Sequence, residues 1–246
     1  MNIPAEFDEI RPYAPEELPQ VFEELIADPM FKAVVESVMP GIPFEMIAAQ
    51  MRQCKTNLDF QKAFFYRLLK DLVQKCAKGL EFDCSAIKDK SINYTFISNH
   101  RDIVLDSALL SVVLIENGMN TVEIAIGDNL LIYPWIKKIV RINKSFIVKR
   151  GLGLREQLKS SMLMSSYMHY AITQKHENIW IAQRQGRAKD SNDRTQDSIL
   201  KMMVMGGEGD IFDRLKEMNL VPLSLSYEFD PCDYLKAKEA QQKRDD

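Results

Sequence analysis

The sequence predicts an α/β fold in which a mixed sheet is flanked by helices and preceded by an N-terminal helical bundle. Apolar residues follow helical spacing through the first ninety residues, whereas short apolar runs alternate with helical stretches from Asn93 onward. At 246 residues and 46% hydrophobic content, the chain can bury one core with a small helical appendage. We therefore expect a helical region over 1–90 and an α/β domain over 91–246.

Three helices are expected in the first region. The first begins near Pro15 and carries an apolar stripe that includes Phe22. The second runs from Asp28 to Val38, where a Pro- and Gly-containing stretch follows, and the third from about Asp59 to Lys78, ahead of Gly79.

In the second region, short apolar runs are typical of strands and the longer amphipathic stretches between them of helices. Strands are expected at 94–98, 122–126, 145–148, 178–182 and 220–226, and helices at 102–116, 153–174 and 195–205. Strands separated by helices favour pairing that is at least partly parallel. The charged tail from Lys236 is expected to form a helix fragment.

Composition excludes some classes of function. A net charge of -3 argues against broad binding of nucleic acid, which requires a strongly basic surface. The four cysteines form no CxxC pair, which favours reduced thiols in a cytoplasmic protein. The polar start and the lack of a long apolar span lead us to expect any membrane contact to be peripheral, from the surface of the inner face.

The stretch Ser98-Asn-His-Arg-Asp-Ile-Val-Leu-Asp106 places His100 where an expected strand gives way to a helix, with a carboxylate following on that helix. A histidine can take a proton from an alcohol, and a carboxylate on its other nitrogen fixes the tautomer. We interpret His100 as a catalytic base and Asp106 as its partner, with Asp102 as the alternative partner. An isolated pair of this kind is more often a helix cap or a core histidine.

Cations follow two further strands. Such clusters suit an anionic group, because arginine offers a planar, bidentate fork to phosphate. The candidate substrate-binding residues in these two clusters are Lys149, Arg150, Arg184, Gln185, Gly186, Arg187 and Lys189.

In this order, the segments resemble the glycerophospholipid acyltransferase family over about residues 93 to 229. That family carries an N-H-x4-D block, then G-A-F-F-I-R-R, E-G-(T/G)-R-S and an (I/V)-P-(V/I) strand. The similar stretches here are Asn99–Asp106, Lys144–Arg150, Gln185–Arg187 and Val221–Leu223.

The resemblance implies an acyltransferase of phospholipid biosynthesis. Its His–Asp dyad would activate a hydroxyl of glycerol 3-phosphate or lysophosphatidate to attack an acyl-CoA or acyl-ACP (acyl carrier protein) thioester. It implies no metal or other cofactor, and its arginines and glycine-containing block would hold the acceptor phosphate.

Three positions depart from the family pattern: Asp106 falls one place late, Lys144 stands where glycine is usual, and Gln185 replaces a glutamate. Two rival hypotheses remain open. One is an acyltransferase for another lipid acceptor, and the other is a non-catalytic protein that binds acyl carrier protein or lipid.

Overall fold

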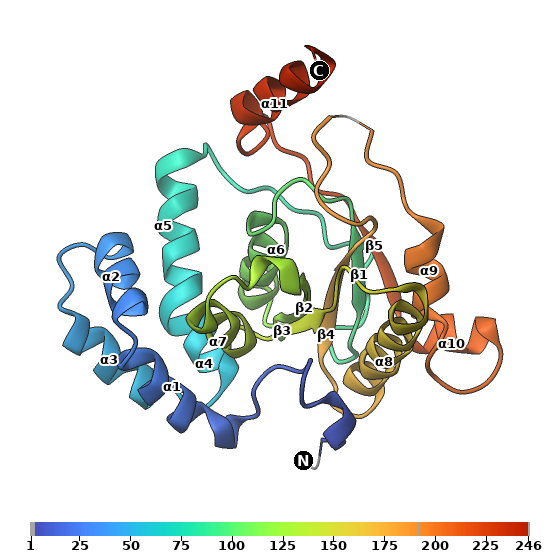
Figure 1. Cartoon of the computed structure of the whole chain (residues 1–246), viewed down its shortest axis with the longest axis horizontal. Coiled ribbons are helices and arrows are strands. Elements are labelled where there is room, and N and C mark those ends of the chain that lie inside the picture. The colour runs from blue at the N-terminus through green and yellow to red at the C-terminus, as the bar shows by residue number, and fades with distance from the viewer. Residues whose placement is uncertain (1–2, 191, 246) are drawn as a thin grey trace. The chain divides into compact units, whose positions relative to one another are not determined.

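The computed structural model describes residues 3–190 and 192–245 and has the expected α/β class (Figure 1). Its five-stranded sheet has the order β3-β2-β4-β1-β5. The strands are β1 (Thr95–Ser98), β2 (Val122–Gly127), β3 (Ser145–Val148), β4 (Asn178–Ala182) and β5 (Leu220–Leu223). The sheet is parallel throughout rather than mixed. A helix joins each strand to the next in sequence, which returns the chain to the same end of the sheet.

The helices confirm the predicted segments and add others. They are α1 (Leu18–Ile26), α2 (Pro29–Val38), α3 (Phe44–Gln53), α4 (Asn57–Phe60), α5 (Arg67–Cys76), α6 (Leu105–Glu116), α7 (Pro134–Ile142), α8 (Leu154–Thr173), α9 (Asp197–Met203), α10 (Ile211–Glu217) and α11 (Asp233–Asp245). A π-helical turn, Gln61–Tyr66, joins α4 to α5, so the expected third helix is continuous through it. The sequence analysis did not anticipate α3, α7 or α10.

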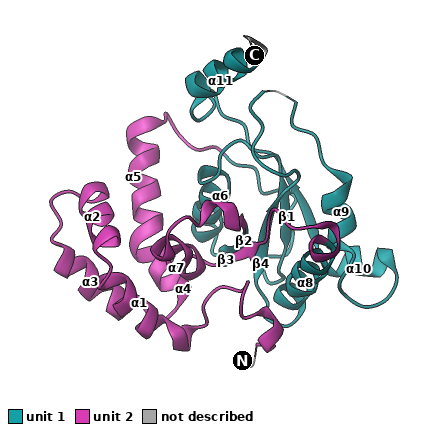
Figure 2. Cartoon of the chain, viewed as in Figure 1, with its two compact units in different colours: residues 1, 82–125, 158–246 teal, residues 2–81, 126–157 magenta. Residues whose placement is uncertain are grey.

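The chain forms two compact units (Figure 2). A helical unit contains the chain up to Glu81 together with residues 126–157, and a sheet unit contains residues 82–125 and 158–246. This division differs from the expected boundary at residue 90, because a later segment belongs to the helical unit.

The core of the helical unit shows why that later segment is needed. Phe22 of α1 and Ile142 of α7 lie in one buried cluster with residues of α2 and α3. The Arg141 guanidinium donates from Nε to the carbonyl of Arg11 at 2.8 Å and stacks 4.1 Å from the Tyr13 ring centroid. Residues of α7 therefore complete the core that the N-terminal helices begin.

In the sheet unit, helices α6 and α8 pack on opposite faces of the sheet. Phe96 and Trp180 are register partners, and both share a buried cluster with Leu110 and Leu114 of α6. In β2, Ile124 pairs with Trp180, so the preceding Glu123 points to the opposite face of the sheet. There Glu123 accepts a 2.5 Å hydrogen bond from the Tyr167 hydroxyl of α8. This arrangement buries the sheet on both sides, as parallel sheets require.

Candidate active site

His100 lies two residues beyond the end of β1, before α6 begins. Its backbone is held on both sides by the segment that follows β4. The His100 N–H donates to Asp193 Oδ2 at 2.8 Å, and its carbonyl accepts from the Ala188 N–H at 2.7 Å. Neighbouring parallel strands end at the same edge of the sheet, so the residues after β4 reach the turn after β1.

The imidazole of His100 has one nitrogen engaged. Its Nδ1 lies 2.9 Å from Asp106 Oδ2, and the ring stands edge-on to Trp180 with 5.8 Å between the centroids. Among the described residues, none hydrogen-bonds Nε2. The His100 side chain keeps 11% of its surface exposed. A proton on Nδ1 directed at the carboxylate would leave the Nε2 lone pair free to accept one.

The Asp106 carboxylate, 0% exposed, is surrounded by donors. Its Oδ2 also accepts from the backbone N–H groups of Arg101 at 2.7 Å and Asp102 at 3.0 Å. Its Oδ1 accepts from the Tyr227 hydroxyl at 2.9 Å. Including the imidazole, four donors compensate a buried negative charge for its lost hydration.

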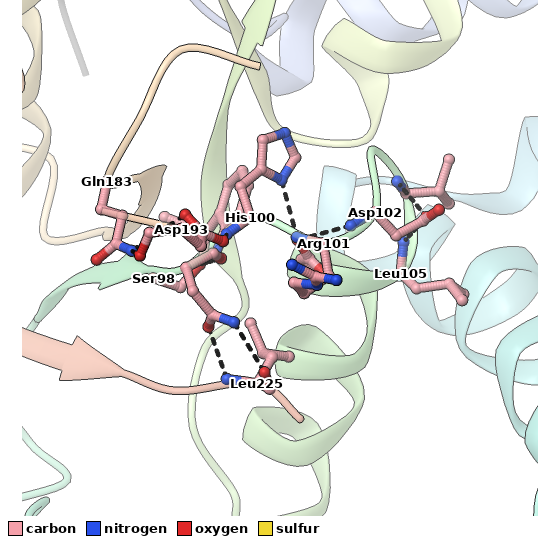
Figure 3. Close-up of polar contacts among 12 residues, drawn as sticks. Ser98, His100, Arg101, Asp102, Leu105, Gln183, Asp193 and Leu225 are labelled. Carbon is pink, nitrogen blue, oxygen red and sulfur yellow. Dashed lines mark hydrogen bonds and ion pairs between the residues drawn. The ribbon is translucent and has the colours of Figure 1, made fainter. Parts of the chain in front are cut away.

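Asp102 has a different partner set. Its Oδ1 accepts from the N–H groups of Val104 at 2.9 Å and Leu105 at 2.8 Å, so it stabilises the turn that leads into α6 (Figure 3). Of the two candidate partners, Asp106 contacts the imidazole.

The block after β4 has a mixed electrostatic environment. Gly186 has φ +73°, a left-handed conformation that favours glycine. Arg184 and Arg187 are half-buried, and no carboxylate in the described ranges pairs with either guanidinium. Lys189, in contrast, forms an ion pair with Glu239 of α11. Two unpaired cations therefore remain in this block for an anionic ligand.

Gln185 contributes mainly through its backbone. The Gln185 N–H donates to Gln196 Oε1 at 2.8 Å, and Gln185 itself is exposed. The neighbouring Gln183 amide donates to Asp193, the same residue that holds the His100 N–H. The β4 segment is thus tied to the His100 turn through Asp193.

Lys149 and Arg150 belong to the helical unit. Lys149 Nζ lies 2.5 Å from Glu9 Oε2, so its charge is already paired. The Arg150 N–H donates to Asp128 Oδ1 at 3.0 Å, and burial lowers the pKa of the Arg150 guanidinium. Lys144 has φ +62°, a left-handed backbone conformation that favours glycine.

Sequence reasoning missed the segment after β5. Asn99 donates from Nδ2 to the Leu225 carbonyl and accepts at Oδ1 from the Leu225 N–H, both at 2.8 Å (Figure 3). This clamp brings Tyr227 to the dyad carboxylate. The available signal was the strand-end rule, since His100, Arg184 and Tyr227 each follow one of three adjacent strands.

The same segment contributes a second group of ionic contacts. Arg101 Nε lies 2.9 Å from Asp230 Oδ1, and Lys236 Nζ donates to the Arg101 carbonyl at 2.8 Å and also contacts Asp230. Burial opposes the charge on Asp230, but the hydrogen bonds from Arg101 and Lys236 outweigh it and lower the pKa of that carboxyl. The turn beside His100 is therefore fixed to the start of α11.

The comparisons with known proteins identify no relative: no protein-family model matches the chain, and no curated protein matches it either. Within residues 3–190 and 192–245, no helix is both long and apolar enough to cross a bilayer. In the same ranges no group of three or more His, Cys, Asp or Glu side chains is arranged to hold a metal ion.

Proposed function

We propose that the chain is an O-acyltransferase that moves a fatty acyl group from acyl-CoA or acyl-ACP to a hydroxyl of glycerol 3-phosphate or lysophosphatidate. The observation that carries this proposal is the His100–Asp106 pair, in which Nδ1 is engaged by a buried carboxylate and Nε2 is not. That is the arrangement a general base for an alcohol needs.

The reaction would proceed through one addition and one elimination. Nε2 of His100 takes the hydroxyl proton as the acceptor oxygen attacks the thioester carbonyl carbon. Asp106 stabilises the resulting imidazolium through Nδ1. The tetrahedral intermediate then collapses to the ester, and the departing sulfur takes the proton from His100, which restores the neutral base and releases thiol.

The unpaired arginines support an anionic acceptor. Arg184 and Arg187 follow β4, the strand next to the one that precedes His100. Guanidinium groups bind phosphate in bidentate geometry, which would place the acceptor hydroxyl near the imidazole. We propose a cytoplasmic enzyme that meets the inner membrane face peripherally, because lysophosphatidate and the acylated product partition into lipid.

Thiol release from acyl-CoA and acyl-ACP, with each acceptor in turn, tests the proposal. His100→Ala should reduce acceptor-dependent release by roughly 10²–10⁴-fold, since a positioned general base contributes that much. His176→Asn is the matched control, because His176 is exposed and asparagine tolerates its left-handed backbone.

Acceptor-independent release, or equal release in folded His100→Ala, would refute the mechanism. Release with lipid extract but with neither glycerol phosphate would redirect the proposal to another lipid acceptor. Binding of acyl carrier protein without any turnover would favour the non-catalytic rival.

A further inference from the structure

We propose that Tyr227 is a positioning residue that lowers the proton affinity of the His100–Asp106 pair by donating a hydrogen bond to the carboxylate oxygen opposite the imidazole. Its consequence for catalysis rests on the proposed acyl transfer, whereas its effect on the proton affinity of the pair does not.

The two oxygens of Asp106 have different donors. Oδ2 receives His100 Nδ1 and two backbone N–H groups, whereas Oδ1 receives the Tyr227 hydroxyl at 2.9 Å. No other described group donates to Oδ1. Because the carboxylate is 0% exposed, water does not replace a missing donor without rearrangement. Tyr227 therefore completes the solvation of the charge and fixes which oxygen faces the imidazole.

The surroundings keep Tyr227 a donor. Burial raises the pKa of its phenol, and the nearby Asp106, Asp102 and Asp230 carboxylates raise it further. The phenol is therefore protonated throughout the range in which a histidine works. The other charged groups facing the pair are Arg101, from the turn before α6, and Asp193, from the segment after β4.

Two anchors hold Tyr227 in place. On one side Asn99 clamps the backbone of Leu225 through two hydrogen bonds, and on the other Asp230 binds Arg101 and Lys236. The tyrosine lies between these points on a segment that has no regular secondary structure. Such bracketing limits the movement of the hydroxyl relative to Asp106, as expected for a group whose role depends on position.

Removal of the Tyr227 hydroxyl should raise the pH at which the His100–Asp106 pair loses its proton. A carboxylate deprived of a donor binds a proton more strongly, whether that proton sits on the imidazole or on the carboxyl group. The pair then loses its proton at higher pH. Loss of a hydrogen bond to a charged group should raise the midpoint of this titration by about one pH unit.

The test compares Tyr227→Phe with Tyr234→Phe, which removes the hydroxyl of a tyrosine that is 72% exposed at the start of α11. NMR titration of ¹³C-labelled histidine follows the pair directly, with the His100 signal assigned from its loss in His100→Ala. The midpoint should rise by about one pH unit in Tyr227→Phe and stay unchanged in Tyr234→Phe. Thermal unfolding confirms that each variant is folded.

Equal midpoints in folded Tyr227→Phe and the natural chain would overturn the proposal. So would an undiminished shift when Tyr227→Phe is added to Asp106→Asn, since the tyrosine would then act by another route. In the acyl-transfer assay, Tyr227→Phe should lower kcat by about tenfold with little change in KM and move the acid limb of the pH profile upward. A shifted titration in a protein without acyl transfer would support Tyr227 and refute the proposed function.

Discussion

Asp102 and Asp106 lie four residues apart and both accept backbone N–H groups, yet only Asp106 reaches the imidazole. Asp102 lies in the turn before α6 and accepts from the N–H groups of Val104 and Leu105. Asp106 lies in the first turn of α6 and contacts the His100 imidazole. The difference comes from where α6 begins, which spacing in the sequence does not specify to one residue.

Substitution of Asp102 separates support of the turn before α6 from catalysis. Asp102→Ala should lower the free energy of unfolding by about 1 kcal/mol, because the Val104 and Leu105 N–H groups lose their acceptor. Asp102→Asn should restore most of that stability, because the asparagine Oδ1 can accept from the same N–H groups. Chemical denaturation measures both values. A kcat reduced in Asp102→Asn as much as in Asp106→Asn would instead assign the catalytic partnership to Asp102.

The cations after β4 should differ in their effect on acceptor binding. Arg187 lacks a carboxylate partner in the described ranges, whereas Lys189 is paired with Glu239, whose pKa the lysine contact lowers to about 2. Arg187→Gln should raise the KM for a phosphate acceptor by roughly tenfold or more, as expected for a lost charged hydrogen bond. Lys189→Gln, measured in the same steady-state assay, should raise it much less. An equal rise in KM in both variants would mean that Lys189 binds the acceptor despite its ion pair with Glu239.

At the scale of elements, the turn between β1 and α6 is fixed to the start of α11 by Asp230. Asp230→Asn removes the charge that compensates Arg101 and the largely buried Lys236. We expect a loss of about 2 kcal/mol in the free energy of unfolding at pH 7, reduced from a fully buried pair by its partial exposure. Glu228→Gln, an exposed neighbour, is the control.

The effect of Asp230 should depend on pH in one direction. Its pKa in the folded protein is lowered below the ordinary aspartate value of 3.8, so its stabilisation is present above that value and disappears as pH falls through the folded pKa. Denaturation between pH 7 and pH 3 should therefore show the difference between Asp230→Asn and the natural chain shrinking only near and below about pH 4. A difference that persists unchanged in strong acid would rule out an ionic origin.

The elements that the sequence predicted correctly are those with a strong local pattern. Every expected strand is present, although the last ends at Leu223 rather than Ser226. Helix α7 was not predicted; Pro134 occupies its first turn, where proline is tolerated. The contact between Tyr227 and Asp106 spans 121 residues, and no local pattern predicts such a pairing.

For the whole molecule, each compact unit is built from stretches that are not consecutive in the sequence. The chain leaves the helical unit after Glu81, forms β1 and α6, and returns for residues 126–157. The boundary near residue 90 was predicted because the spacing of apolar residues changes there. That spacing reports local secondary structure, whereas the boundaries of a unit depend on which distant segments share its core.

A fragment of residues 1–90 should therefore not fold into a stable unit. It would lack Ile142, which is fully buried in the helical core, and Arg141, which binds the carbonyls of Asp8 and Arg11. It would also lose the Ile142 carbonyl that Asn57 contacts at 2.8 Å. Loss of one buried isoleucine alone costs about 2–5 kcal/mol, a large share of the stability of a small domain.

Circular dichroism and the dispersion of amide NMR signals measure this outcome. The fragment 1–90 should show partial helicity without a cooperative thermal transition. A fusion of residues 1–81 to 126–157 through a flexible linker should regain both cooperativity and dispersion, because it restores α7 to the core. Cooperative unfolding of the short fragment would show instead that the N-terminal helices form a self-sufficient bundle, with the boundary near residue 90 that the apolar pattern predicts.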